Sequence, residues 1–480
     1  MPVEYVPIPF SAQALHDLLA AASAATSVDA LLHALSAFAA LHNPEAVGWL
    51  QHGAPSLREA LRLHSGPGFF APAPAGLLRA IAALAAPLHE HFPRGLPLLL
   101  AAPAALALPR PAAACLLACM FLCALPRPHA ECNQSCYAML FGLPSDCGAA
   151  QKLLCALHYF ERAAAAAPRG TLALERVAPP AALVAGGHAA LHARLAACAA
   201  PLLRLEVLRE GSIHDARGAL QADFANRYIG GGTLGGGCVQ EEILFSVAPE
   251  CIVAQLLVPA LAAHEALLIA GVERFSAHAG YARSFRYDGP LQEDCARVAE
   301  GGAAGALAPG SVRAALIAFD ALAFPPREPP AAQLAPELLL RELGKCAAAF
   351  GEGQAPGWPA ELGLPAGAVP PIATGHWGCG AFNGARGGLR GARAAPSPGA
   401  ARARPTSLVS RGAPPPSSLA PLPPHSQATS PSRQPFSGWR PLRRGARCTT
   451  TALGTLPWQS SCGRRRALCL ARQRRRRRRR

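Results

Sequence analysis

The first 200 residues are rich in Ala and Leu, and their polar residues recur at roughly helical intervals. This pattern predicts helices over Ser11–Ala25, Val28–Leu41 and Gly76–His91. Residues 1–200 are therefore expected to form an all-helical region, although the alanine content reflects compositional bias as much as helix preference.

The most apolar stretch of this region runs from Leu96 to Leu125. It is broken by Pro103, Pro109 and Pro111 and carries Arg110, so it lacks the about 18 uninterrupted apolar residues that indicate a membrane-spanning helix. A buried helix over Ala112–Ala124 is predicted instead, and no membrane association is expected.

The pattern changes near residue 201. Leu203–Leu208 alternates apolar and polar positions, as a half-buried strand does, while Glu265–Gly271 and Ala314–Phe319 are short apolar runs typical of buried strands. Helical periodicity returns in Ile243–Leu257 and Gln333–Phe350. Strands that alternate with helices predict an α/β fold, here a layered domain over residues 201–382.

The formal charge of +16 belongs to the end of the chain. Residues 383–480 hold 22 arginines and no lysine or acidic residue, whereas residues 1–382 hold 23 basic and 29 acidic residues. The body is therefore weakly acidic. The tail has few large apolar residues and ends in Arg474–Arg480, a composition that cannot bury enough surface to fold, so a disordered tail is expected.

The 16 cysteines are scattered without a CxxC pair. Several fall four residues apart in or near the apolar stretch, namely Cys115, Cys119, Cys123, Cys132 and Cys136. Small apolar side chains on a buried helix face are the favoured interpretation, with a metal site as the alternative. The N-terminus lacks a basic n-region, so no secretory signal is indicated and a reducing nuclear or cytoplasmic location is expected.

Candidate chemistry is concentrated in Asp223–Phe245, which contains two glycine triplets, Gly230–Gly232 and Gly235–Gly237. Such glycines let backbone amides approach a ligand and form an anion-binding concavity. If Gln240 begins a helix, the helix dipole favours negative charge at the same place. Because Glu241–Glu242 follows directly, phosphate-binding amides and general acid/base candidates are expected to lie together.

This segment resembles the signature of the poly(ADP-ribose) glycohydrolases: three glycines, a short spacer, then Gln-Glu-Glu, preceded by Asp-Phe-Ala-Asn-Arg at 223–227. Further matches to the same family are Ala113–Pro128, Lys152–Val177, Gly280–Ala282, Phe319–Leu322, Pro336–Phe350 and a second glycine-rich loop, Ala373–Phe382. The first two resemble the family's helical accessory region. The resemblance covers roughly residues 112–382 and implies a macrodomain, a mixed sheet between helices that binds ADP-ribose.

The resemblance implies three catalytic residues. Glu242 is the expected general acid that protonates the leaving ribose hydroxyl and then activates water, while Asp223 and Glu241 orient ribose hydroxyls and tune Glu242. A carboxyl group that donates a proton near neutral pH needs a raised pKa, which burial and a neighbouring carboxylate supply. No metal or organic cofactor is implied.

The resemblance also implies the substrate contacts. Asn226 and Gln240 match polar contacts near the scissile ribose, and Gly231 and Gly232 match the first phosphate loop. The residues expected at the adenine, over the ligand and in the second loop are Ile213, His214, Tyr281, His376, Trp377, Gly378, Cys379, Gly380, Ala381 and Phe382. Ordinary core packing is the alternative for the aromatic residues Tyr281 and Phe382.

Two positions depart from the family pattern. His376 stands where the family usually has Asn, so that polar contact is expected to differ. His214 stands where the family has Glu, an acceptor for the adenine amino group. Only a neutral histidine nitrogen could replace that acceptor.

After Phe382 the resemblance stops. The family continues with a helix and a strand that bears an adenine-stacking aromatic residue, so without that strand the sheet is expected to expose an edge. Two interpretations of residues 383–480 stay open. The favoured one is an artefact, such as an intron read through in a GC-rich gene; the other is a nuclear-import or direct nucleic-acid-binding patch.

Two functions from different classes therefore remain. The favoured one is a monomeric glycohydrolase acting on poly(ADP-ribose) and poly(ADP-ribosyl)ated proteins, with a role in the DNA damage response. The alternative is a catalytically impaired ADP-ribose-binding macrodomain from a truncated gene model. The presence of Asp223, Glu241 and Glu242 favours the enzyme, because a binding module needs no acid pair. The sequence does not decide between exo and endo cleavage.

Overall fold

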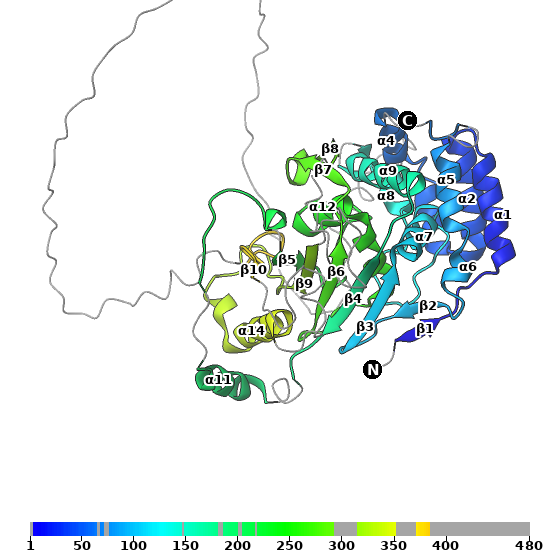
Figure 1. The fold of residues 1–480 in the computed structure, drawn as a ribbon. Coiled ribbons are helices and arrows are strands. Elements are labelled where there is room, and N and C mark those ends of the chain that lie inside the picture. The colour runs from blue at the N-terminus through cyan, green and yellow to red at the C-terminus, as the bar shows by residue number, and fades with distance from the viewer. Residues whose placement is uncertain are drawn as a thin grey trace, which may run out of the picture. The chain divides into compact units, whose positions relative to one another are not determined.

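A computed structural model describes residues 3–64, 68–71, 76–145, 148–180, 186–199, 204–216, 218–291, 314–351 and 371–384. All of them belong to one compact unit within residues 1–400. Helices make up most of the N-terminal part, and a sheet with helices on both faces follows (Figure 1). The predictions for the arginine-rich tail fall on residues 385–480, which lie outside the described residues.

The N-terminal part is a set of packed helices, as the alanine- and leucine-rich pattern predicts. The helices are α1 (Ala12–Ala24), α2 (Val28–His42), α3 (Pro44–Leu50), α4 (Pro55–Leu63), α5 (Leu77–Ala85), α6 (Leu88–His91), α7 (Arg110–Phe121), α8 (Ala138–Gly142) and α9 (Ala149–Ala165). Serine caps begin the first two: Ser11 Oγ accepts from Ala14 N–H at 3.2 Å, and Ser27 Oγ from Ala30 N–H at 3.1 Å. The predicted core helix is confirmed, because every residue of α7 except Pro111 is buried.

The main sheet is mixed. Its strands, in spatial order, are β10 (Ile372–Ala373), β5 (Leu220–Ala225), β9 (Ala314–Asp320), β6 (Ala266–Val272), β4 (Thr171–Val177) and β3 (Ala104–Pro109). β10, β5 and β9 are parallel, whereas β6, β4 and β3 each run antiparallel to the strand before them in this order. Two small antiparallel pairs stand apart: β1 (Glu4–Val6) with β2 (Leu96–Leu98), and β7 (Ser276–Ala279) with β8 (Arg286–Pro290).

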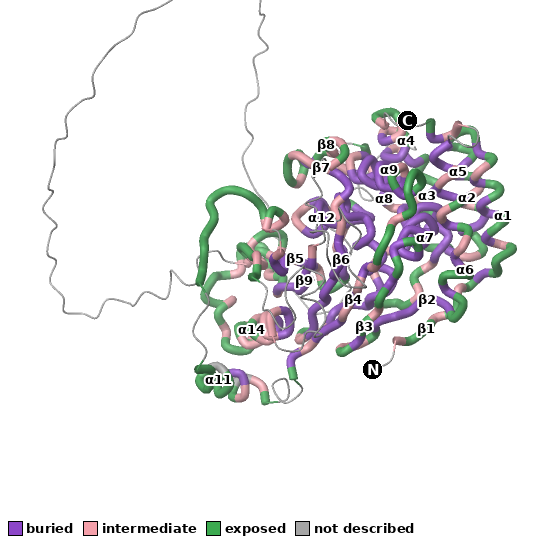
Figure 2. The backbone as a smooth tube through the Cα atoms, in the orientation of Figure 1, coloured by how far each residue is buried: buried purple, intermediate pink, exposed green. Residues whose placement is uncertain are grey.

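Helices cover both faces of this sheet. On one face α14 (Pro336–Phe350) packs Ala348 and Ala349 against β9 and β6, while α7 and α12 (Gln240–Val247) cover the other face. Every residue of β6 is buried, as the central purple strands of Figure 2 show. The predicted fold class, a mixed sheet between helices preceded by a helical region, is confirmed. Two further helices are α11 (Gly187–Ala197), which contacts α14, and α13 (Val253–Leu257), whose residues are all buried.

Two expectations need correction. Residues 1–200 are not helical throughout, because β3 and β4 from this region extend the main sheet and β1 pairs with β2. The alanine-rich β3 is a strand because β4 offers it a ladder of partners, which overrides local preference. Conversely, the described part of the predicted strand at Leu203–Leu208 pairs with no described strand, and Leu205 and Val207 are 85% and 79% exposed.

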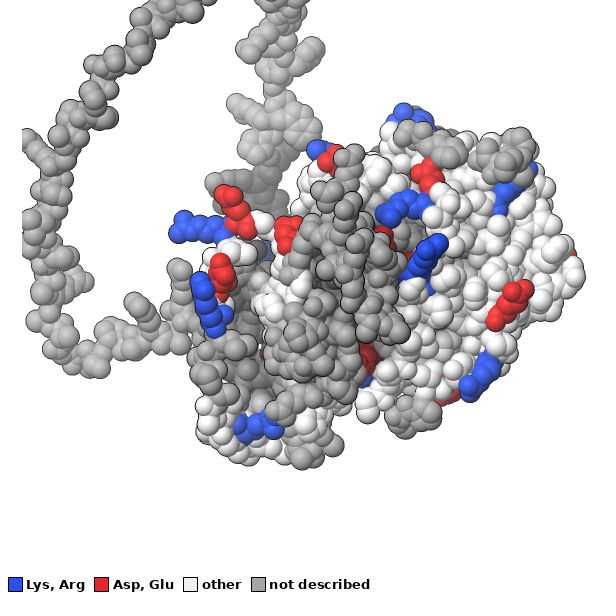
Figure 3. All heavy atoms as spheres, viewed as in Figure 1, with Lys and Arg blue, Asp and Glu red and all other residues white. Residues whose placement is uncertain are grey.

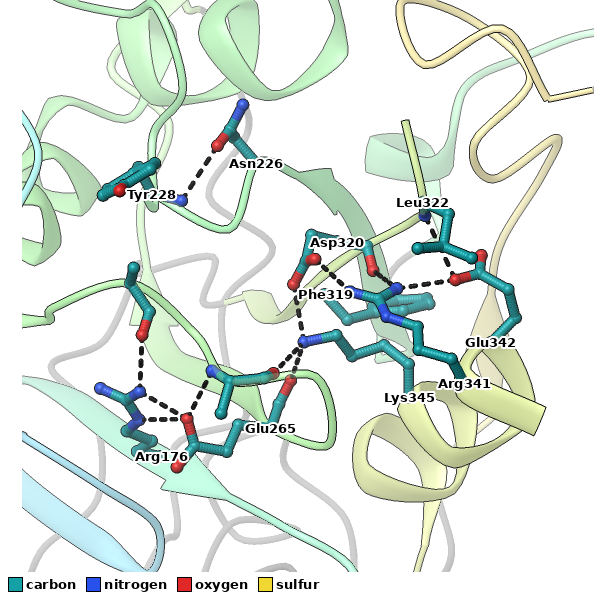
Figure 4. A network of polar contacts seen from close by, with 12 residues as sticks. Arg176, Asn226, Tyr228, Glu265, Phe319, Asp320, Leu322, Arg341, Glu342 and Lys345 are labelled. Atoms are coloured by element: carbon teal, nitrogen blue, oxygen red, sulfur yellow. Dashed lines mark hydrogen bonds and ion pairs between the residues drawn. The ribbon is translucent and has the colours of Figure 1, made fainter. Parts of the chain in front are cut away.

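Buried ion pairs fasten the layers to one another (Figure 4). Lys345 of α14 donates to the carbonyls of Ala262 and Glu265 at 2.7 and 2.6 Å, and its Nζ lies 2.6 Å from Asp320 Oδ1 at the end of β9. Arg176 of β4 pairs with the Glu265 carboxylate. Because each charge is paired, the sheet and α14 hold these groups without an isolated buried ion.

The described surface carries few charges. On the face seen in Figure 3, the blue and red side chains occur singly or in small groups among white residues, without a continuous patch of one sign. None of the described helices is long and apolar enough to cross a membrane. The five cysteines in or near the apolar stretch are all buried, as the core interpretation predicts.

Candidate active site

The candidate site lies where β5 ends and α12 begins. The prediction that Gln240 opens a helix is confirmed, since it is the first residue of α12. Its side chain also bonds to β5: Oε1 accepts from Phe224 N–H at 2.8 Å, and Nε2 donates to the Ala222 carbonyl at 3.2 Å. β10 pairs only with the first two residues of β5. Beyond the end of β10, the Gln240 side chain supplies the hydrogen-bond partners for the edge of β5. In this structure its amide therefore holds the helix to the sheet.

Three carboxyl groups converge at this junction. Asp223 of β5 is completely buried, and Glu241 and Glu242 in the first turn of α12 are nearly so. Glu241 accepts from the N–H groups of Gly230 at 2.6 Å and Asn226 at 2.9 Å. Neither oxygen of Asp223 has a hydrogen-bond partner among the described residues.

Burial and mutual repulsion change the protonation of this cluster. Burial, and then the charge of Glu242, raise the pKa of Asp223 well above its usual range. Burial raises the pKa of Glu241 in the same way, with Asp223 and Glu242 adding to the rise and the Asn226 and Gly230 amides opposing it. The cluster therefore retains protons at a pH where exposed carboxyl groups are ionised.

Glu242 closes the glycine loop onto the helix. Its Oε1 accepts from Gly232 N–H at 2.9 Å, and its Oε2 accepts from Val239 N–H at 2.8 Å just ahead of the helix. The second bond satisfies one of the free amides at the start of α12. Glu242 thus links both ends of the loop to the first turn of the helix.

Glycine is required where the loop passes the carboxylates. Gly231 has φ +47°, and a Cβ there would lie 2.6 Å from Glu242 Oε1 and 2.7 Å from Glu241 Oε2. A Cβ on Gly237 would also lie 2.6 Å from Glu242 Oε1. The amide of Gly231 donates to the Tyr228 carbonyl at 3.0 Å and that of Gly232 to Glu242. Both amides predicted to hold phosphate therefore make hydrogen bonds within the protein. The missing side chains of these glycines leave room for the carboxylates of Glu241 and Glu242.

The helical region supports this loop from behind. Lys152, buried in α9, donates its ammonium hydrogens to loop carbonyls. The four acceptors are Gly232 O at 3.2 Å, Thr233 O at 2.8 Å, Gly235 O at 2.6 Å and Gly237 O at 2.8 Å. Lys152 is not among the residues that the sequence predicts for the site. The available signal was a lysine in an apolar helix, because a buried charge needs partners.

Tyr281 and Asn226 lie at the rim. Tyr281 precedes the short helix at Ala282–Ser284 between β7 and β8 and is 57% exposed. Burial raises the pKa of the Tyr281 hydroxyl, a hydrogen bond with the Gln240 backbone lowers it, and the charge of Glu242 raises it. The hydroxyl therefore lies near the start of α12. Asn226 Oδ1 accepts from Tyr228 N–H at 3.0 Å, as Figure 4 also shows.

The second predicted loop follows β10. Trp377 anchors it, because its indole N–H donates to the Phe319 carbonyl at 3.0 Å and its ring lies 4.7 Å from the Phe319 ring. The Phe382 carbonyl accepts from Phe324 N–H at 2.9 Å, and its side chain is half-buried. The other members are exposed or half-buried: His376, Gly378, Cys379, Gly380 and Ala381. Trp377 is thus a packing residue on β9, whereas His376 faces solvent.

Ile213 and His214 belong to a short 3-10 helix, Ile213–Asp215, before β5. A Cβ on Gly375 would lie 3.5 Å from the Phe224 ring and 3.9 Å from Ile213 Cδ1, so this helix, β5 and the second loop meet. Burial, and then the charge of Arg274, lower the pKa of His214 to about 4. His214 is therefore neutral at pH 7, the state that the predicted adenine contact requires.

Two hollows lie near these elements. One, behind the glycine loop, is lined by Lys152, Thr233 and Ser246 among others, and the second borders Trp377, Gly378 and Cys379. Neither is lined by the three carboxyl groups. Within the described ranges, no group of three or more His, Cys, Asp or Glu side chains is placed to hold a metal ion. The site is thus defined by its polar groups.

A mixed sheet between helices, with a glycine loop and acidic helix start at the carboxyl end of β5, defines a macrodomain-type protein. Sequence comparison agrees: the poly(ADP-ribose) glycohydrolase (PARG) macro domain fold matches residues 192–387, and the PARG helical domain matches residues 74–176. The chain belongs to the poly(ADP-ribose) glycohydrolase family. The resemblance seen in the sequence is therefore confirmed.

Curated relatives are similar over part of their length. Poly(ADP-ribose) glycohydrolase 1 of Arabidopsis thaliana is 42% identical over 142 residues, which are 29% of this chain and 24% of the relative. Probable poly(ADP-ribose) glycohydrolase 2 of the same plant is 37% identical over 30% of this chain and 28% of the relative. Poly(ADP-ribose) glycohydrolase 1 of Caenorhabditis elegans is 35% identical over 38% of this chain and 22% of the relative. The matches thus span about a quarter of each relative.

Proposed function

We propose that this protein hydrolyses the ribose–ribose O-glycosidic bonds of poly(ADP-ribose) and releases ADP-ribose. The observation that carries the proposal is the buried cluster of Asp223, Glu241 and Glu242 at the start of α12. Burying three carboxyl groups side by side is costly, and a module that only binds ADP-ribose gains nothing from it. Family membership supports the same activity.

Glu242 is the proposed general acid and base. Protonated Glu242 gives its proton to the leaving ribose oxygen as the glycosidic C–O bond breaks, which leaves an oxocarbenium-like centre on the other ribose. A water then attacks that centre, and Glu242 takes up the water's proton. The carboxyl group returns to its starting state, so the cycle consumes only water.

Asp223 and Glu241 are proposed to support this step. Both have raised pKa values, so protons stay within the cluster and Glu242 can draw on a neighbouring carboxyl group. The negative charge that the cluster does carry favours the positive charge of the oxocarbenium-like centre. Their carboxyl oxygens are also the proposed partners for the ribose hydroxyls.

The remaining contacts are proposed from their positions around the cluster. Tyr281 has an open ring beside the carboxylates, suited to cover a bound ribose or phosphate. Neutral His214 and the neighbouring Ile213 side chain are the proposed adenine contacts. In the second loop, exposed His376 is a better candidate for phosphate contact than Trp377, which is held by β9.

One observation favours the alternative, an ADP-ribose-binding protein with impaired catalysis. Both oxygens of Glu242 accept backbone N–H groups, so both are engaged within the protein. A general acid must hold a proton in the substrate complex, so substrate binding has to displace or weaken at least one of these bonds. A binding module faces no such demand.

The test is release of ADP-ribose from purified poly(ADP-ribose) by the full chain, beside Glu242→Gln. Loss of general acid catalysis is expected to lower the rate by roughly 10²–10⁴-fold. ADP-ribose affinity, measured by calorimetry, should change little, because the amide keeps the carboxyl group's shape. No release by a folded wild-type chain that still binds ADP-ribose would establish the binding module instead.

The wider setting is proposed from the sequence. We expect a monomer in the nucleus or cytoplasm that acts on poly(ADP-ribosyl)ated proteins during the DNA damage response. Direct nucleic-acid binding is the weaker proposal, since the positive charge lies in residues 383–480 and the rest of the chain is weakly acidic.

A further inference from the structure

One asparagine of the helical region contacts the glycine loop at several points. Asn133, between α7 and α8, donates from Nδ2 to the Gly231 carbonyl at 2.8 Å and the Ile229 carbonyl at 2.9 Å. The Tyr228 carbonyl lies 3.1 Å from the same nitrogen. A side-chain amide carries two hydrogens, so the two shorter contacts use both in full.

The peptide groups that Asn133 binds are the ones that reach the carboxylates. The Ile229 carbonyl shares a peptide group with Gly230 N–H, which donates to Glu241 Oε1 at 2.6 Å. The Gly231 carbonyl shares one with Gly232 N–H, which donates to Glu242 Oε1 at 2.9 Å. In a trans peptide the C=O and N–H point in opposite directions, so holding the carbonyl aims the N–H.

We propose that Asn133 is a positioning residue that sets the orientation of both glutamates through these two peptide groups. This inference rests on the proposed function and deepens it. The helical region then takes part in catalysis through the backbone of the loop, without touching the substrate. Hydrogen bonds in such a chain polarise one another, so each amide donates more strongly when its carbonyl is also bonded.

Asn133 is itself held in place. Its Oδ1 accepts from Gln134 N–H at 2.8 Å, which orients the side-chain amide with Nδ2 toward the loop. Its backbone N–H donates to the Gln255 carbonyl at 3.1 Å, which ties it to α13. The donor therefore stands at a defined place before any substrate arrives.

Lys152 binds the carbonyl groups of the other half of the loop. Its four carbonyl contacts run from Gly232 to Gly237, two residues before Val239, whose N–H donates to Glu242 Oε2. Asn133 thus orients the peptide group whose N–H binds Oε1 of Glu242. Lys152 holds the loop two residues before Val239, whose N–H binds Oε2. Seven loop carbonyls face the helical region through these two side chains.

The chain contains a matched control for each side chain. Asn43 is a buried asparagine in the helical region whose Nδ2 also donates to carbonyls, those of Cys123 at 3.0 Å and Leu125 at 2.9 Å. Lys345 is a buried lysine that donates to two carbonyls on the opposite face of the sheet. Substituting either control removes carbonyl contacts that lie away from the glycine loop, and Lys345→Met also removes the ion pair with Asp320.

The first readout is steady-state kinetics of the full chain with poly(ADP-ribose). Asn133→Ala is expected to lower kcat by roughly 10- to 100-fold with little change in KM, because misplacing a catalytic group by about 1 Å is enough for such a loss. Asn43→Ala should lower thermal stability and leave kcat per folded molecule unchanged. The proposal would be overturned if the two variants had equal kcat, or if Asn133→Ala changed KM and left kcat at the wild-type value.

The second readout does not need activity. Hydrogen exchange of the Gly230 and Gly232 amides should be faster by about tenfold or more in Asn133→Ala, since each amide loses the support of its carbonyl. Lys152→Met should speed exchange of Val239, and Lys345→Met should not. If the wild-type chain releases no ADP-ribose, the proposed function fails, but exchange still decides the positioning role. Unchanged exchange at Gly230 and Gly232 would overturn it.

A third variant covers the case in which Asn133→Ala does not fold. Asn133→Asp keeps the size and the acceptor for Gln134 N–H but turns an oxygen toward the loop carbonyls. We expect this variant to show the same faster hydrogen exchange at Gly230 and Gly232 and the same loss of kcat. A folded Asn133→Asp chain with wild-type kcat and exchange would contradict the proposal as firmly as the alanine variant.

Discussion

The side chain of Gln240 bonds to the backbone of β5 at Phe224, where its Oε1 accepts the N–H at 2.8 Å. The first residue of the acidic helix is thereby fastened to the strand that carries Asp223. This bond brings the three carboxyl groups together from two elements that are 16 residues apart at the contact.

Gln240→Ala is expected to lower the free energy of unfolding by roughly 1–3 kcal/mol, because it leaves a part-buried N–H and carbonyl of β5 without partners. Urea unfolding measures the change. Gln13→Ala removes an exposed side-chain bond to Asp17 and should stay within about 0.5 kcal/mol of wild type. An equally small loss for Gln240→Ala would show that the helix is held to β5 by other contacts.

Gly231→Ala is expected to abolish most activity and to destabilise the fold by roughly 1–3 kcal/mol, because the new methyl group meets both glutamates at a positive φ. Initial rates and thermal unfolding test this. Gly236→Ala is the matched control in the same loop, since a Cβ there has no heavy atom within 4 Å and its φ is not positive. Similar activity of the two variants would contradict the close approach seen at Gly231.

Asp223→Asn is expected to stabilise the protein at neutral pH. The pKa of Asp223 is raised in the folded state, so the folded chain holds a proton that the unfolded chain releases above about pH 4. Wild-type stability therefore falls as pH rises from there toward the folded pKa, and the neutral amide removes this loss. Unfolding free energies at a series of pH values test it. A variant with the wild-type pH slope would show that Asp223 is not the group responsible.

The same substitution changes the neighbouring carboxyl group. The Asp223 charge contributes to the raised pKa of Glu241, so Asp223→Asn should lower that pKa toward its ordinary value. The pH profile of kcat/KM should shift to lower pH if these carboxyl groups act as one cluster. The opposite shift would indicate that hydrogen bonds of Asp223 dominate over its charge.

His214 is expected to titrate near pH 4, because burial and Arg274 lower its pKa to about that value. Between the usual histidine pKa of about 6.5 and pH 4 the unfolded chain binds a proton that the folded chain excludes, so this contribution to stability is lost as pH falls through that range. Nitrogen-15 NMR of the imidazole measures the titration directly. An imidazolium signal at pH 6 would remove the proposed adenine acceptor.

Much of the fold follows from local patterns. Regular spacing of polar and apolar residues predicts α1 and α2, and the apolar runs predict β6 and β9, all of which the structure contains. The pattern was misleading where pairing decides the outcome. β3 is alanine-rich yet lies in the sheet beside β4, whereas Leu205 and Val207 alternate like a strand yet stay exposed. A strand exists only with a neighbour, and local sequence does not contain that neighbour.

The sequence by itself determined the catalytic candidates of this protein, because glycines and adjacent glutamates at fixed spacing form a local signature. Only the tertiary structure decided how they are held. It placed Asp223 beside Glu242 without a hydrogen-bond partner among the described residues. It also turned the Gly230 and Gly232 amides onto the glutamates and brought Asn133 and Lys152 behind the loop. The contacts of Asn133 and Lys152 with the loop join residues about 80 to 100 positions apart, and the burial that raises the pKa values of Asp223 and Glu241 arises only when the layers pack.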